Sequence, residues 1–162
     1  MINGLYFITP TGTEERIIAA VRAALLGGAR VVQYRDKERS REVQVALAHR
    51  LGTLCRAAGA TFLVNDDPLV ARDSGADGVH LGQGDGSVAA ARALLGDGQL
   101  IGISTRTVAQ ALKAVSDGAD YIGLGAMFPT GSKGDAELVG VTRLREVRQA
   151  VQVPIVAIGG IS

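Results

Sequence analysis

Apolar and polar positions divide the chain into two alternating kinds of segment. Short runs rich in β-branched and aromatic residues are apolar at both odd and even positions. This pattern is expected of parallel strands that are covered on both faces. Segments rich in Ala, Leu, Arg and Glu separate these runs and have helical spacing. The runs are 5–9, 30–35, 61–66, 78–82, 100–105, 121–126 and 154–160, and the clearest helical segments are 14–27, 40–58, 87–95, 107–117 and 141–150. The alternation predicts βα units and a parallel sheet.

A Gly-Ala pair stands directly before four of the predicted strands. The pairs begin at Gly28, Gly59, Gly75 and Gly118. Glycine just past a helix readily adopts the left-handed conformation that ends the helix. We therefore expect one local device, a helix stop followed by a strand, to recur around the fold.

Polar groups follow the carboxyl ends of six successive predicted strands, beginning with the second. They are Gln33, Arg35 and Lys37; Asn65 and Asp66; Gln83 and Asp85; Ser104; Thr130, Ser132 and Lys133; and the Gly159-Gly160 backbone. The strands fit either an open doubly wound sheet, whose site lies at one switch point, or a (β/α)8 TIM barrel, whose site collects groups at its C-terminal face. Contributions from six strands meet only in a ring, so an α/β chain with the TIM barrel fold is favoured.

The sequence stops at Ser162, just after the seventh predicted strand. Because such barrels usually need about 200 residues or more, we expect a single domain, residues 1–162, that is a barrel truncated after strand 7. It would lack helix 7, strand 8 and helix 8, and strands 1 and 7 would have unpaired edges.

The stretch VVQYRDK, residues 31–37, begins as a buried strand and ends in polar groups. Because successive side chains of a strand point to opposite faces, Gln33, Arg35 and Lys37 share one face, and Val32 and Tyr34 share the other. A guanidinium and an ammonium group at a barrel mouth suit phosphate or pyrophosphate. The alternative is a solvated strand end, which explains one cation more readily than two on the same face.

Acidic residues end the next two predicted strands. VNDDP contains Asn65, Asp66 and Asp67, and Asp85 follows the fourth strand. Neighbouring parallel strands lie about 4.8 Å apart, so Asp66 and Asp85 could share one cation. Two carboxylates without a His or Cys cluster suit Mg²⁺, which keeps waters and takes phosphate oxygens from a substrate. The alternative for Asp-Asp-Pro is a turn, and we expect Asp67 to cap the following helix.

Two loops carry groups that suit a second phosphate. The long loop 126–140 contains Thr130, Gly131 and Ser132, followed by Lys133 as a third cation of the anion site. The loop after strand 7 contains Gly160, whose amide could approach an anion closely in a region where such barrels often hold phosphate. The sequence therefore predicts two phosphorylated substrates, or one diphosphate ester and one monophosphate.

Charge and cysteine content narrow the class of function. The formal net charge is +1, from 17 basic and 16 acidic residues, which favours small-molecule substrates over a nucleic-acid or membrane partner. The single cysteine, Cys55, excludes an intrachain disulfide and fits the cytoplasm. Homo-oligomerisation is left open. We expect His80 in the core or barrel wall, and no Ser/His/Asp or Cys/His arrangement supports a protein nucleophile.

Several motifs together resemble the thiamine phosphate synthase family. They are QYRDK (33–37), NDD (65–67), GVHLGQGD (78–85), GIST (102–105), GLGAMFPTGSK (123–133) and AIGGI (157–161), in order along essentially the whole chain. The resemblance implies a (β/α)8 barrel that couples 4-amino-2-methyl-5-hydroxymethylpyrimidine diphosphate to 4-methyl-5-(2-hydroxyethyl)thiazole phosphate, or its carboxylated form. Thiamine phosphate and pyrophosphate would be the products of this dissociative, Mg²⁺-assisted substitution.

The resemblance also implies roles for individual residues. Catalytic roles fall on Arg35, Lys37, Lys133 and Ser104, and Gln33 joins the three cations in binding the diphosphate. Asn65 and Ser104 would position the pyrimidine substrate, and Asp66 and Asp85 would bind Mg²⁺. The thiazole phosphate site would consist of Thr130, Gly131, Ser132 and Gly160. Ser132 stands where the family often has threonine, and the family's eighth strand end, which completes the thiazole phosphate site, is absent from the sequence.

Two other functions remain open at this stage. One is a related thiazole tautomerase, an isomerase that does not need the full Mg²⁺ and diphosphate set. The chain has the Mg²⁺ and diphosphate residues that a tautomerase does not need, and this argues against the isomerase. These residues are Asn65, Asp66, Asp85 and Lys133. The other is a truncated, inactive barrel that binds phosphate ligands, which the missing eighth strand would favour.

Overall fold

Strands and helices alternate along the chain in the computed structural model, which describes residues 2–129 and 138–161. The strands in these residues are β1 (Leu5–Ile8), β2 (Ala29–Tyr34), β3 (Thr61–Asn65), β4 (Gly78–Leu81), β5 (Leu100–Thr105), β6 (Tyr121–Leu124) and β7 (Ile155–Ala157). The helices are α1 (Glu14–Leu26), α2 (Arg41–Ala57), α3 (Pro68–Ser74), α4 (Val88–Leu95), α5 (Val108–Ser116) and α6 (Gly140–Ala150). The predicted βα alternation is confirmed.

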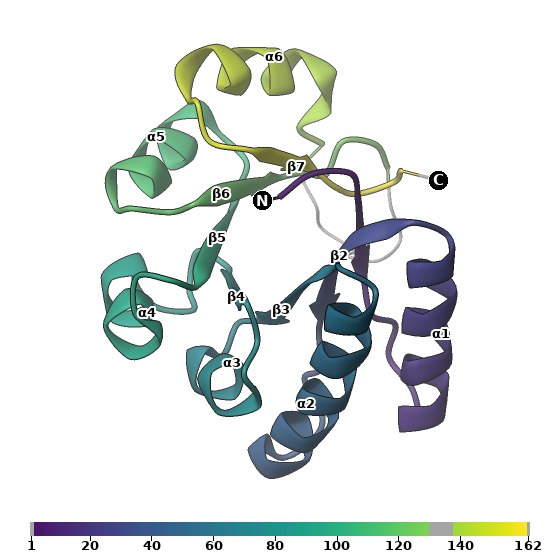
Figure 1. Cartoon of the computed structure of the whole chain (residues 1–162). Helices are drawn as coiled ribbons and strands as arrows, with labels where there is room; N and C mark the ends of the chain where they lie inside the picture. Colours follow the sequence, from purple (N-terminus) through teal and green to yellow (C-terminus); the bar gives the residue numbers. More distant parts are fainter. Residues whose placement is uncertain (1, 130–137, 162) are drawn as a thin grey trace.

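The strands form one parallel sheet whose order, β1 to β7, is the order of the sequence. The sheet curves around a central axis, and the helices lie outside it (Figure 1). This arrangement confirms the barrel class over an open doubly wound sheet, because in a barrel each strand lies beside its sequence neighbour. The described residues contain no eighth strand, and β1 and β7 are the outermost strands of the order.

The last two strands end earlier than the predicted runs 121–126 and 154–160. β6 stops at Leu124 and β7 at Ala157. Gly159 and Gly160 have φ angles of 96° and 68°, so the backbone leaves the extended conformation there. The amides of Met127 and Phe128 donate to the carbonyls of Ile158 and Gly159, at 2.9 Å each, and this places the two strand exits side by side.

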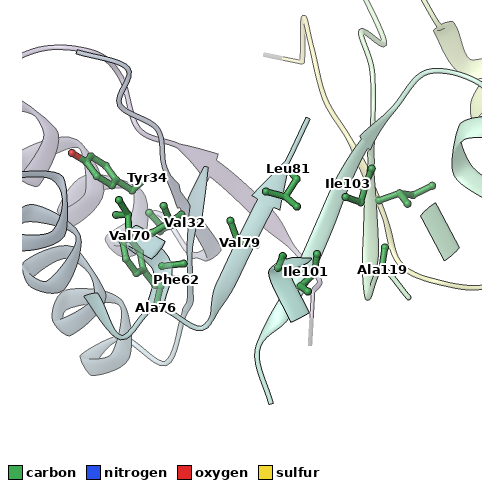
Figure 2. Close-up of a cluster of buried hydrophobic side chains, with 14 of the residues drawn as sticks. Val32, Tyr34, Phe62, Val70, Ala76, Val79, Leu81, Ile101, Ile103 and Ala119 are labelled. Carbon is green, nitrogen blue, oxygen red and sulfur yellow. The ribbon is translucent and has the colours of Figure 1, made fainter. Parts of the chain in front are cut away.

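Side-chain parity produces an outer and an inner apolar layer. Val32, Tyr34, Phe62, Val79 and Ile101 belong to the larger cluster, between the strands and the helices (Figure 2). Ile2, Val31, Leu63 and Tyr121 pack together in a second, smaller cluster that is separate from the first. Val31 and Val32 therefore lie on opposite faces of β2, as the alternation predicts.

The Gly-Ala pairs have the predicted backbone geometry. Gly28, Gly59, Gly75 and Gly118 all have positive φ angles, between 67° and 94°. Each follows a helix and precedes a strand, so the same helix stop recurs at the amino ends of β2, β3, β4 and β6.

An aspartate follows two of these Gly-Ala pairs and clips the amino end of the preceding strand. The Ile101 amide donates to Asp120 Oδ2 at 2.7 Å, and the Asp120 amide donates to the Ile101 carbonyl at 2.8 Å. The Arg92 guanidinium donates to the same Asp120 oxygen at 2.7 Å. Asp77 makes the same two bonds to Phe62. These clips lie at the end of the barrel opposite the predicted site.

Asp120→Asn is expected to lower the free energy of unfolding by about 1–2 kcal/mol, because a hydrogen-bonded carboxylate is replaced by an uncharged amide beside Arg92. Urea denaturation measures the change. The exposed Asp97 provides a control, since Asp97→Asn should cost less than about 0.5 kcal/mol. Equal midpoints for the two variants would contradict the proposed clip.

Candidate active site

The carboxyl ends of β2 and β3 place a pair of amide side chains together. Gln33 is buried, and its Nε2 donates to Asn65 Oδ1 at 3.3 Å. β2 and β3 are paired in register over Gln33 and Leu63, which brings the neighbouring strand end within reach. A predicted diphosphate ligand, Gln33, and a predicted pyrimidine-positioning residue, Asn65, therefore contact each other.

The exit of β2 is tied to the exit of β1. The Thr9 amide donates to the Gln33 carbonyl at 2.9 Å, and the Arg35 amide donates to Thr9 Oγ1 at 3.0 Å. Thr9 is buried. These bonds fix the backbone from which Arg35 and Lys37 extend.

Lys37 and Asp66, predicted to bind diphosphate and metal, form an ion pair. Lys37 Nζ lies 3.4 Å from Asp66 Oδ2, with side chains that are 60% and 30% exposed. Asp66 has φ 66°, in the left-handed region that aspartate tolerates better than most residues. Its amide donates to the His80 carbonyl at 2.8 Å, which extends the β3–β4 pairing past Asn65.

Asp85 lies beside Asp66, as predicted for residues that end adjacent strands. Burial raises the pKa of Asp66, the hydrogen bond and charge of Asp85 raise it further, and Lys37 opposes the shift. A nearby divalent cation would relieve this repulsion between two carboxylates. The described residues contain no group of three or more His, Cys, Asp or Glu that could hold a metal. One or two carboxylates with substrate phosphates are sufficient for Mg²⁺, so the donor set fits this metal.

The turn after β4 holds Asp85 in place. Asp85 Oδ2 accepts from the Gly82 amide at 2.7 Å. A Cβ atom at position 82 would lie 2.6 Å from that oxygen, so a larger residue there would displace the Asp85 carboxylate. Gln83 Nε2 donates to the Ser104 carbonyl at 2.7 Å and connects the turn to β5.

Asp67 has the structural role that the sequence predicted. Its Oδ1 accepts from the amides of Leu69 and Val70, at 2.8 and 3.2 Å, and Pro68 opens α3. The two adjacent aspartates are therefore divided between a helix cap and the candidate metal pair.

A chain of hydrogen bonds crosses the barrel interior and ends on Ser104. The hydroxyls of Tyr6 and Tyr121 lie 3.1 Å apart, Tyr121 Oη lies 2.9 Å from His80 Nδ1, and His80 Nε2 lies 2.9 Å from Ser104 Oγ. Burial raises the pKa of both tyrosines. Both phenols therefore stay protonated at neutral pH. His80 lies in the barrel wall, as predicted, but its contact with Ser104 was not predicted.

Two glycines make room for this chain of rings. A Cβ at Gly102 would lie 2.0 Å from Tyr121 Cζ, and one at Gly123 would lie 3.1 Å from His80 Cε1. Glycine inside a strand often marks a close approach of another group. Gly102 in LIGIST and Gly123 in YIGLGA were thus the sequence signals that could have indicated these rings.

The second predicted phosphate site is described only at Gly160. Thr130, Gly131, Ser132 and Lys133 lie outside the described residues. A Cβ at Gly160 would lie 2.7 Å from the carbonyl oxygens of Phe128 and Pro129. Contact with the exit of β6 is therefore enough to require glycine at position 160, and anion binding by its amide stays a prediction.

No helix in residues 2–129 and 138–161 is long and apolar enough to cross a bilayer.

Comparisons with known proteins show which family the chain resembles. The family model described as thiamine monophosphate synthase matches residues 5–162. The chain is 49% identical to the thiamine biosynthesis bifunctional protein ThiED of Geobacter sulfurreducens over 162 residues, which are all of this chain and 33% of that protein. It is 48% identical to the thiamine-phosphate synthase of Methylococcus capsulatus, over 98% of this chain and 72% of that protein.

A solved structure extends the likeness to three dimensions. The thiamine phosphate pyrophosphorylase of Pyrococcus furiosus is 37% identical, has a TM-score of 0.87, and is matched over 98% of this chain and 75% of its own length. The chain thus spans about a third of the bifunctional relative and about three quarters of the other two proteins. On the family model and these identities, the chain belongs to the thiamine monophosphate synthase family.

Proposed function

We propose that the protein is a thiamine phosphate synthase. It joins 4-amino-2-methyl-5-hydroxymethylpyrimidine diphosphate to 4-methyl-5-(2-hydroxyethyl)thiazole phosphate, or to its carboxylated form, and releases pyrophosphate. The observation that carries the proposal is the grouping of Lys37, Asp66 and Asp85 at adjacent strand ends, where one cation lies next to two carboxylates. An enzyme that expels pyrophosphate needs this combination, and an isomerase acting on the thiazole alone does not.

The diphosphate group of the first substrate is bound by Arg35 and Lys37, with Lys133 as a third cation. Arginine pairs with phosphate oxygens through two parallel hydrogen bonds, and lysine acts as a compact charge. Lys37 exchanges its partner Asp66 for diphosphate when the substrate binds. The cations stabilise the charge that grows on the departing pyrophosphate.

Asp66 and Asp85 would hold Mg²⁺ next to these cations. When bound, the metal neutralises charge on the pyrophosphate leaving group. The pair is suited to it because burial and the Asp85 charge raise the pKa of Asp66, and Lys37 opposes this shift.

The pyrimidine ring is oriented by the polar groups nearest the barrel axis. Gln33 and Asn65 form one pair, and Ser104, held by His80, lies two strands farther along the sheet. An electron-rich aminopyrimidine tolerates positive charge on its methylene carbon as pyrophosphate leaves. The thiazole nitrogen then captures that carbon, provided that its phosphate is anchored nearby by Thr130, Gly131, Ser132 and Gly160. No protein nucleophile is needed.

The direct test mixes the purified protein with Mg²⁺ and both substrates and quantifies thiamine phosphate and pyrophosphate by liquid chromatography. Equimolar products that disappear when Mg²⁺ is chelated are expected. A protein that isomerises the carboxylated thiazole phosphate without consuming the pyrimidine diphosphate would instead be a tautomerase. A folded protein that binds both substrates without converting either would be a phosphate-binding barrel.

A further inference from the structure

The turn between β2 and α2 contains a buried carboxylate that faces away from the candidate metal pair. The Asp36 side chain is 4% exposed, although the neighbouring Lys37 side chain is 60% exposed. Tyr34, which packs in the outer apolar layer, donates its hydroxyl to Asp36 Oδ2 at 2.9 Å. Asp36 therefore lies on the Tyr34 side of the strand exit, and Lys37 lies on the side of Asp66.

Donors from the turn itself occupy both oxygens of Asp36. The amides of Glu38 and Arg39 donate to Oδ1 at 3.0 and 3.1 Å. The Arg39 guanidinium pairs with Oδ2, which also accepts from Tyr34. The carboxylate thus folds residues 36–39 into a closed turn, and its lone pairs are directed at protein donors rather than at the site.

Arg39 connects this turn to its two neighbouring segments. Its Nη2 donates to the Gly12 carbonyl at 2.6 Å, in the connection between β1 and α1. Its own carbonyl accepts from Gln44 Nε2 at 2.9 Å, in the first turns of α2. Hydrogen bonds therefore hold the Asp36 turn, residues 36–39, to the β1–α1 connection and to α2.

The Asp36 carboxylate stays ionised throughout the neutral pH range. Burial alone would raise its pKa, but the hydrogen bonds from Glu38, Arg39 and Tyr34 outweigh burial and lower the pKa to about 2. A permanent negative charge at this position keeps Arg39 paired, which in turn keeps the turn attached to Gly12.

We propose that Asp36 is a positioning residue for the diphosphate site, because it fixes the turn from which Arg35 and Lys37 extend. The inference rests on the proposed function, and it adds a role for an acidic side chain of QYRDK that points away from the ligand. Binding energy increases when the groups that contact a ligand are ordered beforehand. Thr9 holds the backbone of Arg35 before Lys37, and Asp36 holds the amides of Glu38 and Arg39 directly after it.

The test is calorimetric titration of the full chain with magnesium pyrophosphate. Asp36→Asn keeps the shape of the side chain but removes its charge, and we expect the dissociation constant to rise about tenfold or more, because charge-assisted hydrogen bonds are roughly twice as strong as neutral ones. Asp120→Asn is the matched control, since Asp120 also pairs with an arginine and accepts from a backbone amide. The Asp120→Asn variant should bind pyrophosphate as the unchanged protein does.

The kinetic counterpart separates positioning from general loss of structure. In Asp36→Asn the KM for the pyrimidine diphosphate should rise, and the KM for the thiazole phosphate should stay the same. Equal losses in Asp36→Asn and Asp120→Asn, or unchanged pyrophosphate binding in a folded Asp36→Asn variant, would overturn the proposal. Because pyrophosphate binding needs no turnover, failure of synthase activity alone would count against the proposed function and not against the role of Asp36.

A milder variant covers the case in which Asp36→Asn does not fold. Tyr34→Phe keeps the ring in the outer apolar layer and removes only its hydrogen bond to Asp36. Pyrophosphate should bind about threefold more weakly to this variant, as expected for one lost hydrogen bond of about 0.5–1 kcal/mol. Binding identical to that of the unchanged protein would contradict the role assigned to Asp36.

Discussion

Replacement of Asp66 by asparagine is expected to lower the rate of thiamine phosphate formation at least about 100-fold, as for the loss of a group that stabilises transition-state charge, and to remove the dependence of the rate on Mg²⁺. Asparagine is the appropriate substitute because it tolerates the left-handed backbone of position 66, where φ is 66°. Alanine would add backbone strain to the loss of the carboxylate. Initial rates measured across a Mg²⁺ titration give both quantities.

The neighbouring aspartate provides the control for this experiment. Asp67 caps α3 through the amides of Leu69 and Val70, and asparagine caps helices as well as aspartate does. Asp67→Asn should therefore retain both the rate and its Mg²⁺ dependence. An Asp66→Asn variant that responds to Mg²⁺ like the unchanged protein would contradict the assignment of the metal pair.

Gly102→Ala is expected to lower the free energy of unfolding by about 2 kcal/mol, as for an overpacked core, and to reduce activity strongly. The added methyl group would lie 2.0 Å from Tyr121 Cζ. The ring cannot move freely, because its hydroxyl is bonded to both Tyr6 and His80. Displacement of the ring would also move His80 and therefore Ser104, and an error of about 1 Å in such a site can cost about 100-fold in rate.

A double-mutant cycle tests this mechanism. In a Tyr121→Ala background the space is open, so adding Gly102→Ala should cost less than about 0.5 kcal/mol. Gly98 has no heavy atom within 4 Å of its would-be Cβ, and Gly98→Ala serves as the stability control. An equal cost of Gly102→Ala with and without the Tyr121 ring would contradict the steric explanation.

The two faces of VVQYRDK could be predicted because they follow from local periodicity. The barrel arrangement could be predicted because polar groups follow six successive strands. Val32 and Tyr34 lie in the outer apolar layer, while Gln33 reaches Asn65 on β3. The helix cap at Asp67 was also predictable, since Asp-Pro is a local signal for a helix start. Adjacent strands in a parallel barrel then bring Asp66 and Asp85 together without further information.

The chain from Tyr6 to Ser104 could not be predicted in the same way. Its three links join residues that are 115, 41 and 24 positions apart in the sequence. Periodicity places each residue on a face of its own strand, but it does not determine which rings meet across the barrel. The sequence indicated this arrangement only through Gly102 and Gly123, which leave space for the rings.

Asp36 illustrates a different limit. No role was predicted for Asp36 from the sequence, although its parity places it on the same face as Tyr34. Its bonds to Glu38, Arg39 and Tyr34 depend on the conformation of the turn. The pattern of alternating side chains ends where the strand ends, so the role of Asp36 became visible only in the structure.

The most direct test of the central claim, that the strand ends of β2 to β4 form a metal-diphosphate site, is a crystal structure with Mn²⁺ and pyrophosphate. Anomalous scattering locates Mn²⁺ without ambiguity, and Mn²⁺ accepts the same oxygen ligands as Mg²⁺. We expect one Mn²⁺ between Asp66 and Asp85, and a pyrophosphate that contacts both this ion and Arg35, with Lys37 moved from Asp66 to the phosphate. A Mn²⁺ bound elsewhere, or a pyrophosphate that contacts neither Arg35 nor Lys37, would contradict the account.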